Sequence, residues 1–209
     1  MSYYASDVIR QASRAAQTAN SATLGERVVP VKFVWSALEA VVADTDGVHA
    51  VTSSLHNGPT TWTTALTNPP CPRNITATSA GTAGDIAAGV VAVTGTNWQD
   101  EVITENLPTF TENSGTTVEG TLAFKTVTEV VVPDMDGAGA SVSIGFGSLL
   151  GMPYILDHPD GMILATYHDG ALESTPPTLV HDATDIEANT LLLDSALDGS
   201  EVQVYMLVG

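Results

Sequence analysis

The sequence predicts a mainly β protein whose body is a β-sandwich or is jelly-roll-like. Apolar residues make up 44% of the chain and charged residues only 14%, while Thr, Ser and Gly dominate the remainder, and this composition favours strands and turns over helical bundles. After residue 27, short apolar runs recur between turn signals, as they do in sandwiches and barrels. Prolines fall between these runs, where strands can end.

The expected strands follow one another along most of the chain. The first begins at Arg27 and includes Trp35, which we expect in the core, and the apolar stretch continues to Ala43, where a helical turn at residues 36–42 is an alternative. Further strands are expected at residues 48–55, 60–66, 74–80, 89–95, 101–107, 116–123, 125–132, 140–145, 162–168, 177–182, 190–193 and 202–208. A chain of 209 residues can bury a core of this kind without disulfides or metals.

Residues 2–20 form the one convincing helical stretch. Ser6 is a candidate N-cap. The apolar positions near helical spacing are Val8, Ile9, Ala12, Ala15, Ala16 and Ala19. Because a face made mainly of alanine buries little area, this segment needs a partner surface to stay ordered. We therefore divide the chain into an N-terminal arm, 1–32, helical or extended, and a β body, 33–209, with a candidate subdivision near 153–161.

Charge is distributed unevenly between the arm and the body. The net charge of the chain is −18, yet residues 1–32 hold four bases and two acids, which leaves −20 on the other residues. An acidic body repels phosphate, so we expect no nucleic-acid partner and no anionic membrane surface. The chain begins without a signal-peptide pattern and has no apolar run long enough to span a membrane, so we expect a protein made in the cytoplasm.

Two copies of Asp-x-Asp-Gly are the only candidate metal sites. Asp44 and Asp46 form the first pair and Asp134 and Asp136 the second, and clustered carboxylates of this type can bind Ca²⁺. Neither copy continues into the remaining ligands of an EF-hand loop. We interpret both primarily as turns in which Asp caps its own backbone and Gly adopts a positive φ.

Other patterns point away from catalysis. His181, Asp182 and Asp185 form the one local acid–base cluster, which we interpret as solvated loop chemistry. The glycine-rich stretch 145–151 has no P-loop lysine, so its glycines are expected at a strand end or bulge. Cys71 is the only cysteine and lies between prolines, which excludes an intrachain disulfide and a Cys-based zinc site. We expect no enzyme activity and no cofactor.

The candidate interface residues are aromatic or basic side chains, since such residues often anchor protein contacts. They are Tyr3, Tyr4, Arg10, Arg14, Arg27, Lys32 and Arg73. Trp62 and Trp98 are candidates for an exposed aromatic face.

Several phrases of the sequence resemble a family of structural proteins of tailed bacteriophages that is associated with capsid decoration. The most telling is Asn-Pro-Pro-Cys-Pro-Arg-Asn at residues 68–74. Other matching segments are 44–50, 67–76, 93–96, 101–105, 123–128, 145–147, 150–153 and 195–208. Together they span residues 44–208, so the N-terminal arm lies outside the resemblance.

The resemblance implies an all-β cement protein present in many copies on the capsid exterior. It would be a homo-oligomer, with a trimer favoured, that clamps neighbouring subunits of the major capsid protein, and it carries over no catalytic residues. The alternative is a tail, fibre or baseplate component with a host-surface or carbohydrate-binding role, built around Trp62 or Trp98. A glycan hydrolase remains a third hypothesis, although no carboxylate pair stands out for it.

Overall fold

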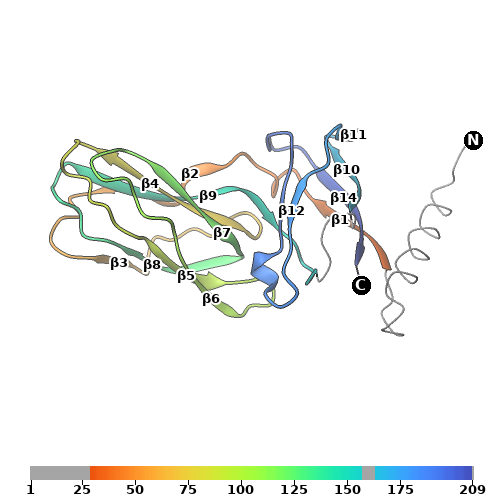
Figure 1. Ribbon diagram of the computed structural model, residues 1–209, viewed down its shortest axis with the longest axis horizontal. Coiled ribbons are helices and arrows are strands. Elements are labelled where there is room, and N and C mark those ends of the chain that lie inside the picture. The colour runs from red at the N-terminus through yellow and green to blue at the C-terminus, as the bar shows by residue number, and fades with distance from the viewer. Residues whose placement is uncertain (1–28, 157–162, 209) are drawn as a thin grey trace, which may run out of the picture.

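The computed structural model describes residues 29–156 and 163–208, and it confirms a mainly β protein built from antiparallel sheets (Figure 1). The expected arm helix at residues 2–20 lies outside these ranges. The described helical structure is a short 3-10 turn, η1 (Ile186–Ala188). No helix in the described ranges is long and apolar enough to cross a membrane.

The largest sheet is built around one long strand, β9 (Ala140–Gly151). Along one side β9 pairs with β4, which in turn pairs with β7. Along its other side β9 pairs with β2 and, nearer its end, with β13, which in turn pairs with β12. These strands are β2 (Asp44–Ser53), β4 (Arg73–Gly81), β7 (Thr117–Phe124), β12 (Thr178–Val180) and β13 (Thr190–Leu192).

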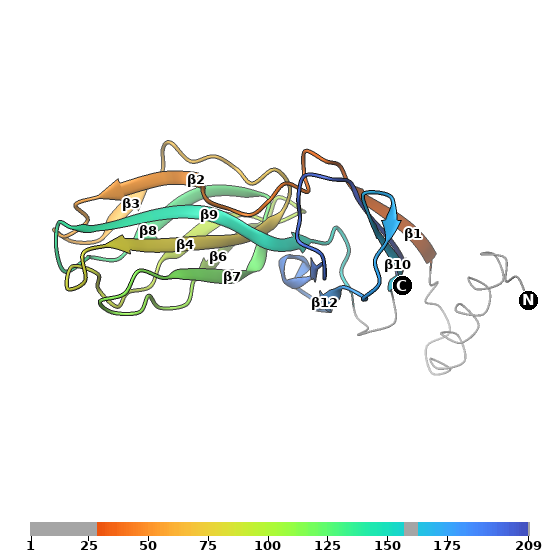
Figure 2. The ribbon, with the colours of Figure 1, turned by 90° about the horizontal axis from the view of Figure 1, so that it is seen from above.

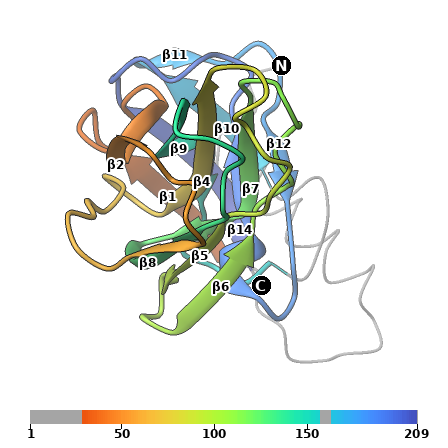
Figure 3. The same ribbon diagram turned by 90° about the vertical axis from the view of Figure 1, so that its left-hand side faces the viewer.

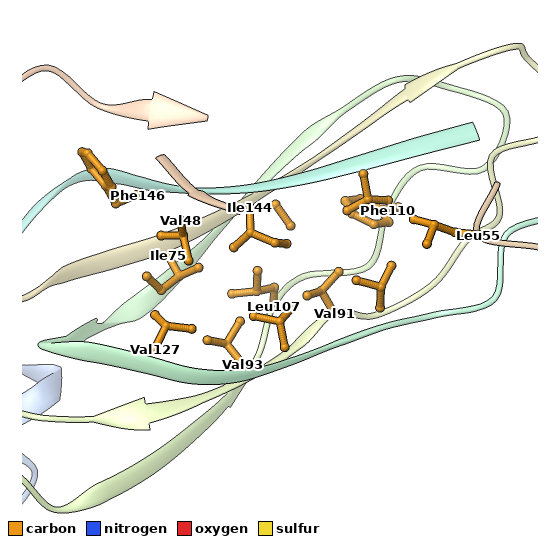
Figure 4. Packing of buried hydrophobic residues seen from close by; sticks show 14 of the residues in the cluster. Val48, Leu55, Ile75, Val91, Val93, Leu107, Phe110, Val127, Ile144 and Phe146 are labelled. Atoms are coloured by element: carbon orange, nitrogen blue, oxygen red, sulfur yellow. The ribbon is translucent and has the colours of Figure 1, made fainter. Parts of the chain in front are cut away.

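A four-stranded sheet packs against the first part of the β9 sheet to make a sandwich (Figures 2 and 3). Its strands, in spatial order, are β3 (Thr60–Trp62), β8 (Thr126–Val132), β5 (Ala92–Thr96) and β6 (Val102–Asn106). Alternate residues of both sheets fill the space between them: Ile75 and Ile144 come from one sheet, and Val93 and Val127 from the other (Figure 4).

A third sheet lies beyond the sandwich (Figure 1). Its strands, in spatial order, are β1 (Val29–Trp35), β14 (Val202–Val208), β10 (Ile163–His168) and β11 (Ala171–Leu172), and we call it the β14 sheet. Its inner face contributes Trp35, Val204 and Met206 to a second hydrophobic cluster, which also contains Leu150 and Leu191. The second core is therefore discontinuous in sequence, because its strands come from both ends of the described chain.

The structure confirms some local expectations and corrects others. Residues 29–32 form the first half of β1 and pair with β14, as the strand expected from Arg27 predicts. The glycine-rich stretch 145–151 runs to the end of β9 at Gly151, and the pairing of β9 with β4 is irregular between Phe146 and Leu150, which confirms the expected strand end or bulge. The first Asp-x-Asp-Gly, at 44–47, opens β2 rather than making a turn, and Gly47 has no positive φ. Strand β11 was not expected, since two residues carry no periodic signal.

Candidate interaction surfaces

Residues 68–74 form a set of tertiary contacts at the join between the two cores. The Asn68 side chain accepts a hydrogen bond from the backbone of Val127 in β8 at 3.0 Å. The Asn74 amide donates to the Gly120 carbonyl at 3.1 Å, and its Oδ1 accepts from the Leu149 amide at 3.0 Å. Asn74 therefore bridges β7 and β9, and residues 68–74 have a structural role in this chain.

Arg73 is buried rather than exposed, which corrects its assignment as an interface residue. Its side chain is 0% exposed, and its Nη1 donates to the Val41 carbonyl at 2.8 Å. The guanidinium lies 4.8 Å from the centre of the Phe146 ring. Burial lowers the pKa of Arg73 to about 10. Its Nε and Nη2 have no hydrogen-bond partner within the described residues.

Cys71 lies beside Arg73 and is a buried thiol. It is 5% exposed, and its Sγ donates to the Glu39 carbonyl at 3.5 Å. Burial raises the pKa of Cys71 to about 12, so the thiol stays protonated at neutral pH. These surroundings stabilise a packed thiol and do not produce a nucleophile.

The Asp-x-Asp-Gly segments do not assemble metal sites in the described part of the chain. No group of three or more metal-ligating side chains occurs there. Asp44 accepts a hydrogen bond from the Asp46 amide at 3.1 Å, and the side-chain contact with Asp44, together with charge repulsion, raises the pKa of Asp46. In the second segment, Asp134 accepts from the Gly58 amide at 2.9 Å, which ties two loops together.

The two aromatic side chains considered for carbohydrate binding are engaged within the chain. Trp62 stacks on His49 with ring centres 3.9 Å apart, so His49 covers one face of its ring. Trp98 meets Phe33 edge to face at 6.1 Å. Trp35 is 1% exposed, which confirms its expected place in the core. One face of the Trp62 ring is therefore unavailable to a sugar ring.

The structure reveals a cluster of carboxylates around His168 that the sequence did not predict. Its Nε2 lies 3.0 Å from Asp198 and its Nδ1 3.8 Å from Glu173, which also accepts a hydrogen bond from Ser195 at 3.0 Å. The contact with Asp198 ties β10 to the chain that precedes β14. These residues are far apart in sequence, so no local motif signals them.

The expected loop cluster at residues 181–185 is confirmed as local turn chemistry. Asp182 accepts hydrogen bonds from the Thr184 amide at 2.7 Å and the Asp185 amide at 2.9 Å. These backbone hydrogen bonds lower the pKa of Asp182. The carboxylate caps its own turn.

The described surface is strongly acidic. Residues 29–156 and 163–208 hold 20 of the 24 acids and three of the six bases of the chain. Of these bases, Arg73 is buried, Lys125 pairs with Asp100 at 2.7 Å, and Lys32 lies 5.5 Å from the centre of the Tyr205 ring. The remaining candidate interface residues, which are Tyr3, Tyr4, Arg10, Arg14 and Arg27, lie outside the described residues.

The outer face of the β14 sheet gathers apolar and aromatic side chains. In register, Lys32, Tyr205 and Ala165 form one row across β1, β14 and β10. The next row on the same face is Val34, Gln203, Tyr167 and Leu172. The rings of Tyr167 and Tyr205 meet edge to face at 5.8 Å. The period-2 alternation of 202–208, in which Gln203 and Tyr205 stand between buried residues, is the sequence signal for this face.

Comparison with known proteins does not indicate a function, so the function is inferred from the sequence, the fold and the surfaces described above. No protein-family model, curated protein sequence or solved structure matches the chain. The features to be explained are the acidic surface of the body, the basic segment that precedes β1 and the outer face of the β14 sheet.

Proposed function

We propose that this protein is a non-enzymatic structural component of a bacteriophage virion, which binds the capsid exterior as a decoration, or cement, protein. The observation that carries the proposal is the charge contrast between the described body and the first 28 residues. The body holds 20 acids against three bases, whereas residues 1–28 hold three bases and two acids. The sequence resemblance over residues 44–208 gives the virion as the setting.

The charge contrast favours a protein partner. A surface with many carboxylates repels nucleic acid and anionic lipid, because binding to either requires Lys and Arg to displace counterions. Arg10, Arg14 and Arg27 supply positive charge at one end of the chain, where it can contact a neighbouring protein. The partner we propose is the major capsid protein.

The contacts of residues 68–74 support a body that binds as one unit. Asn68 and Asn74 link β7, β8 and β9, while Arg73 reaches the carbonyl of Val41. A preorganised body loses little conformational freedom on binding. A ligand that binds only the expanded capsid lattice stabilises that lattice by mass action, and this is the role we propose for the protein, as a trimer.

Deleting residues 2–24 tests this function. We expect the truncated protein to lose co-sedimentation with expanded capsids, because the arm supplies the tether, and to keep the circular dichroism spectrum of the body. The matched control is full-length protein carrying Glu112→Gln, an exposed loop position, which should bind like the unaltered chain. Undiminished binding by the truncated protein, or immunogold label on tails instead of heads, would contradict the proposal.

A further inference from the structure

The loop that joins β2 to β3 contains the one Asn-Gly step of the sequence, Asn57–Gly58. Asn57 is exposed, and Gly58 has a φ of +107° with open space where a side chain would stand. Because glycine has no Cβ, its backbone nitrogen is less hindered than that of any other residue. The side-chain carbonyl carbon of Asn57 and the backbone nitrogen of Gly58 are therefore a candidate reacting pair.

The loop between β8 and β9 contacts this nitrogen. Asp134 accepts a hydrogen bond from the Gly58 amide at 2.9 Å through its Oδ1. Beside this contact, the Met135 amide donates to the Leu55 carbonyl at 2.7 Å. Leu55 is 4% exposed and packs at one end of the sandwich core (Figure 4). Two hydrogen bonds and a buried side chain thus hold the two loops against each other.

We propose that Asn57 is a site of spontaneous deamidation and that the Asp134 carboxylate restrains its rate. In this reaction the Gly58 nitrogen loses its proton and attacks the side-chain carbonyl carbon of Asn57. The new C–N bond closes a succinimide ring, and the side-chain nitrogen leaves as ammonia with the proton that Gly58 gave up. Water from the solvent then opens the ring at either carbonyl, which leaves aspartate or isoaspartate at position 57.

The contact with Asp134 slows the first step of this reaction. The nitrogen can attack only after its proton has left, and a charge-assisted hydrogen bond to a carboxylate holds that proton in place. The carboxylate also opposes the negative charge that forms on the nitrogen, since the two like charges would lie within hydrogen-bonding distance. Conversion therefore waits until the hydrogen bond between Gly58 and Asp134 has opened.

The product alters the contact between the two loops. A carboxylate at position 57 lies beside the residue that Asp134 binds, so the two negative charges repel each other. Isoaspartate also adds a methylene group to the main chain, which displaces Gly58 from its position against Asp134. Each conversion is irreversible to the amide, adds negative charge to an acidic body and loosens the contact between the loops.

Timed incubation of the full-length protein at mildly alkaline pH, followed by peptide mapping with mass spectrometry, measures the conversion. Asp134→Ala removes the acceptor of the Gly58 hydrogen bond. Asp136→Ala is the matched control, because Asp136 is also exposed, lies in the same loop and carries the same charge. Asn113 is exposed and precedes a serine, so its own conversion reports any general loosening of the fold within the same sample.

We expect Asp134→Ala to make conversion at position 57 roughly tenfold faster, as for the loss of one hydrogen bond to a charged group, and to leave the rate at position 113 unchanged. Asp136→Ala should change neither rate. An unchanged or lower rate at position 57 in the Asp134→Ala protein would overturn the inference. An equal rise in both aspartate variants, or at both asparagines, would also overturn it, because net charge or general loosening would then be the cause.

Discussion

At the scale of single residues, Arg73 shows how a cation can be held in the interior without a carboxylate partner. Its aliphatic stem and guanidinium fill the join between the two cores, with the Val41 carbonyl and the Phe146 ring as its described partners. Burial without a counter-ion disfavours the charged form, which is why its pKa falls to about 10. Packing volume, more than charge, is therefore what we expect Arg73 to contribute to stability.

Two substitutions separate volume from charge at this position. Arg73→Ala should lower the free energy of unfolding by about 3 kcal/mol, because it leaves a cavity. Arg73→Met keeps most of the volume and removes a buried charge, so it should cost less than about 1.5 kcal/mol. Urea unfolding followed by circular dichroism measures both. Equal losses for the two variants would show that the guanidinium itself supplies the stability.

At the scale of elements, β9 connects the two cores, and glycine allows its neighbours to approach. Its first half pairs with β2 and β4 in the sandwich, and its last residues pair with β13. At Gly145 a Cβ would collide with the backbone carbonyl of Asp44 in β2. The sequence placed the glycines of residues 145–151 at a strand end or bulge, and in the sheet Gly145 makes room for the irregular start of β2.

We expect Gly145→Ala to destabilise the fold more than the same substitution at a glycine that has open space around it. It should lower the free energy of unfolding by about 3 kcal/mol, since backbone atoms of Asp44 and Thr45 would have to move. Gly58→Ala is the comparison, because Gly58 has open space around it but a φ of +107°, and it should cost about 1 kcal/mol. Chemical denaturation measures the loss of unfolding free energy in both variants. A smaller loss for Gly145→Ala than for Gly58→Ala would contradict the proposed crowding at Gly145.

At the scale of the whole molecule, the excess of negative charge affects the stability of the folded body. Among the described residues the charge pairs are few: Lys125–Asp100 is solvent-exposed, and the other pairs involve His168. An exposed pair of this kind contributes little, whereas many like charges on one surface repel one another. The folded body is therefore destabilised by its own charge.

Added salt should raise the thermal unfolding midpoint. Between about 0.01 M and about 0.1 M salt the Debye length falls from ~30 Å to ~10 Å, which screens repulsion across the acidic surface. Differential scanning calorimetry at neutral pH measures the shift, with a chloride salt of a monovalent cation so that specific binding is avoided. A midpoint that falls with salt would mean that attractive ion pairs outweigh the repulsion.

The sequence by itself determined the fold class, most of the strands and the burial of Trp35, because period-2 alternation and turn residues are local signals that survive in the folded state. It also determined the acidity of the body. Tertiary structure alone decided that Arg73 is interior, that His168 meets Asp198 and Glu173, and that β1 joins β14 to make a second core. Those features depend on contacts between residues far apart in the chain, and no local pattern encodes which distant strand will become a neighbour.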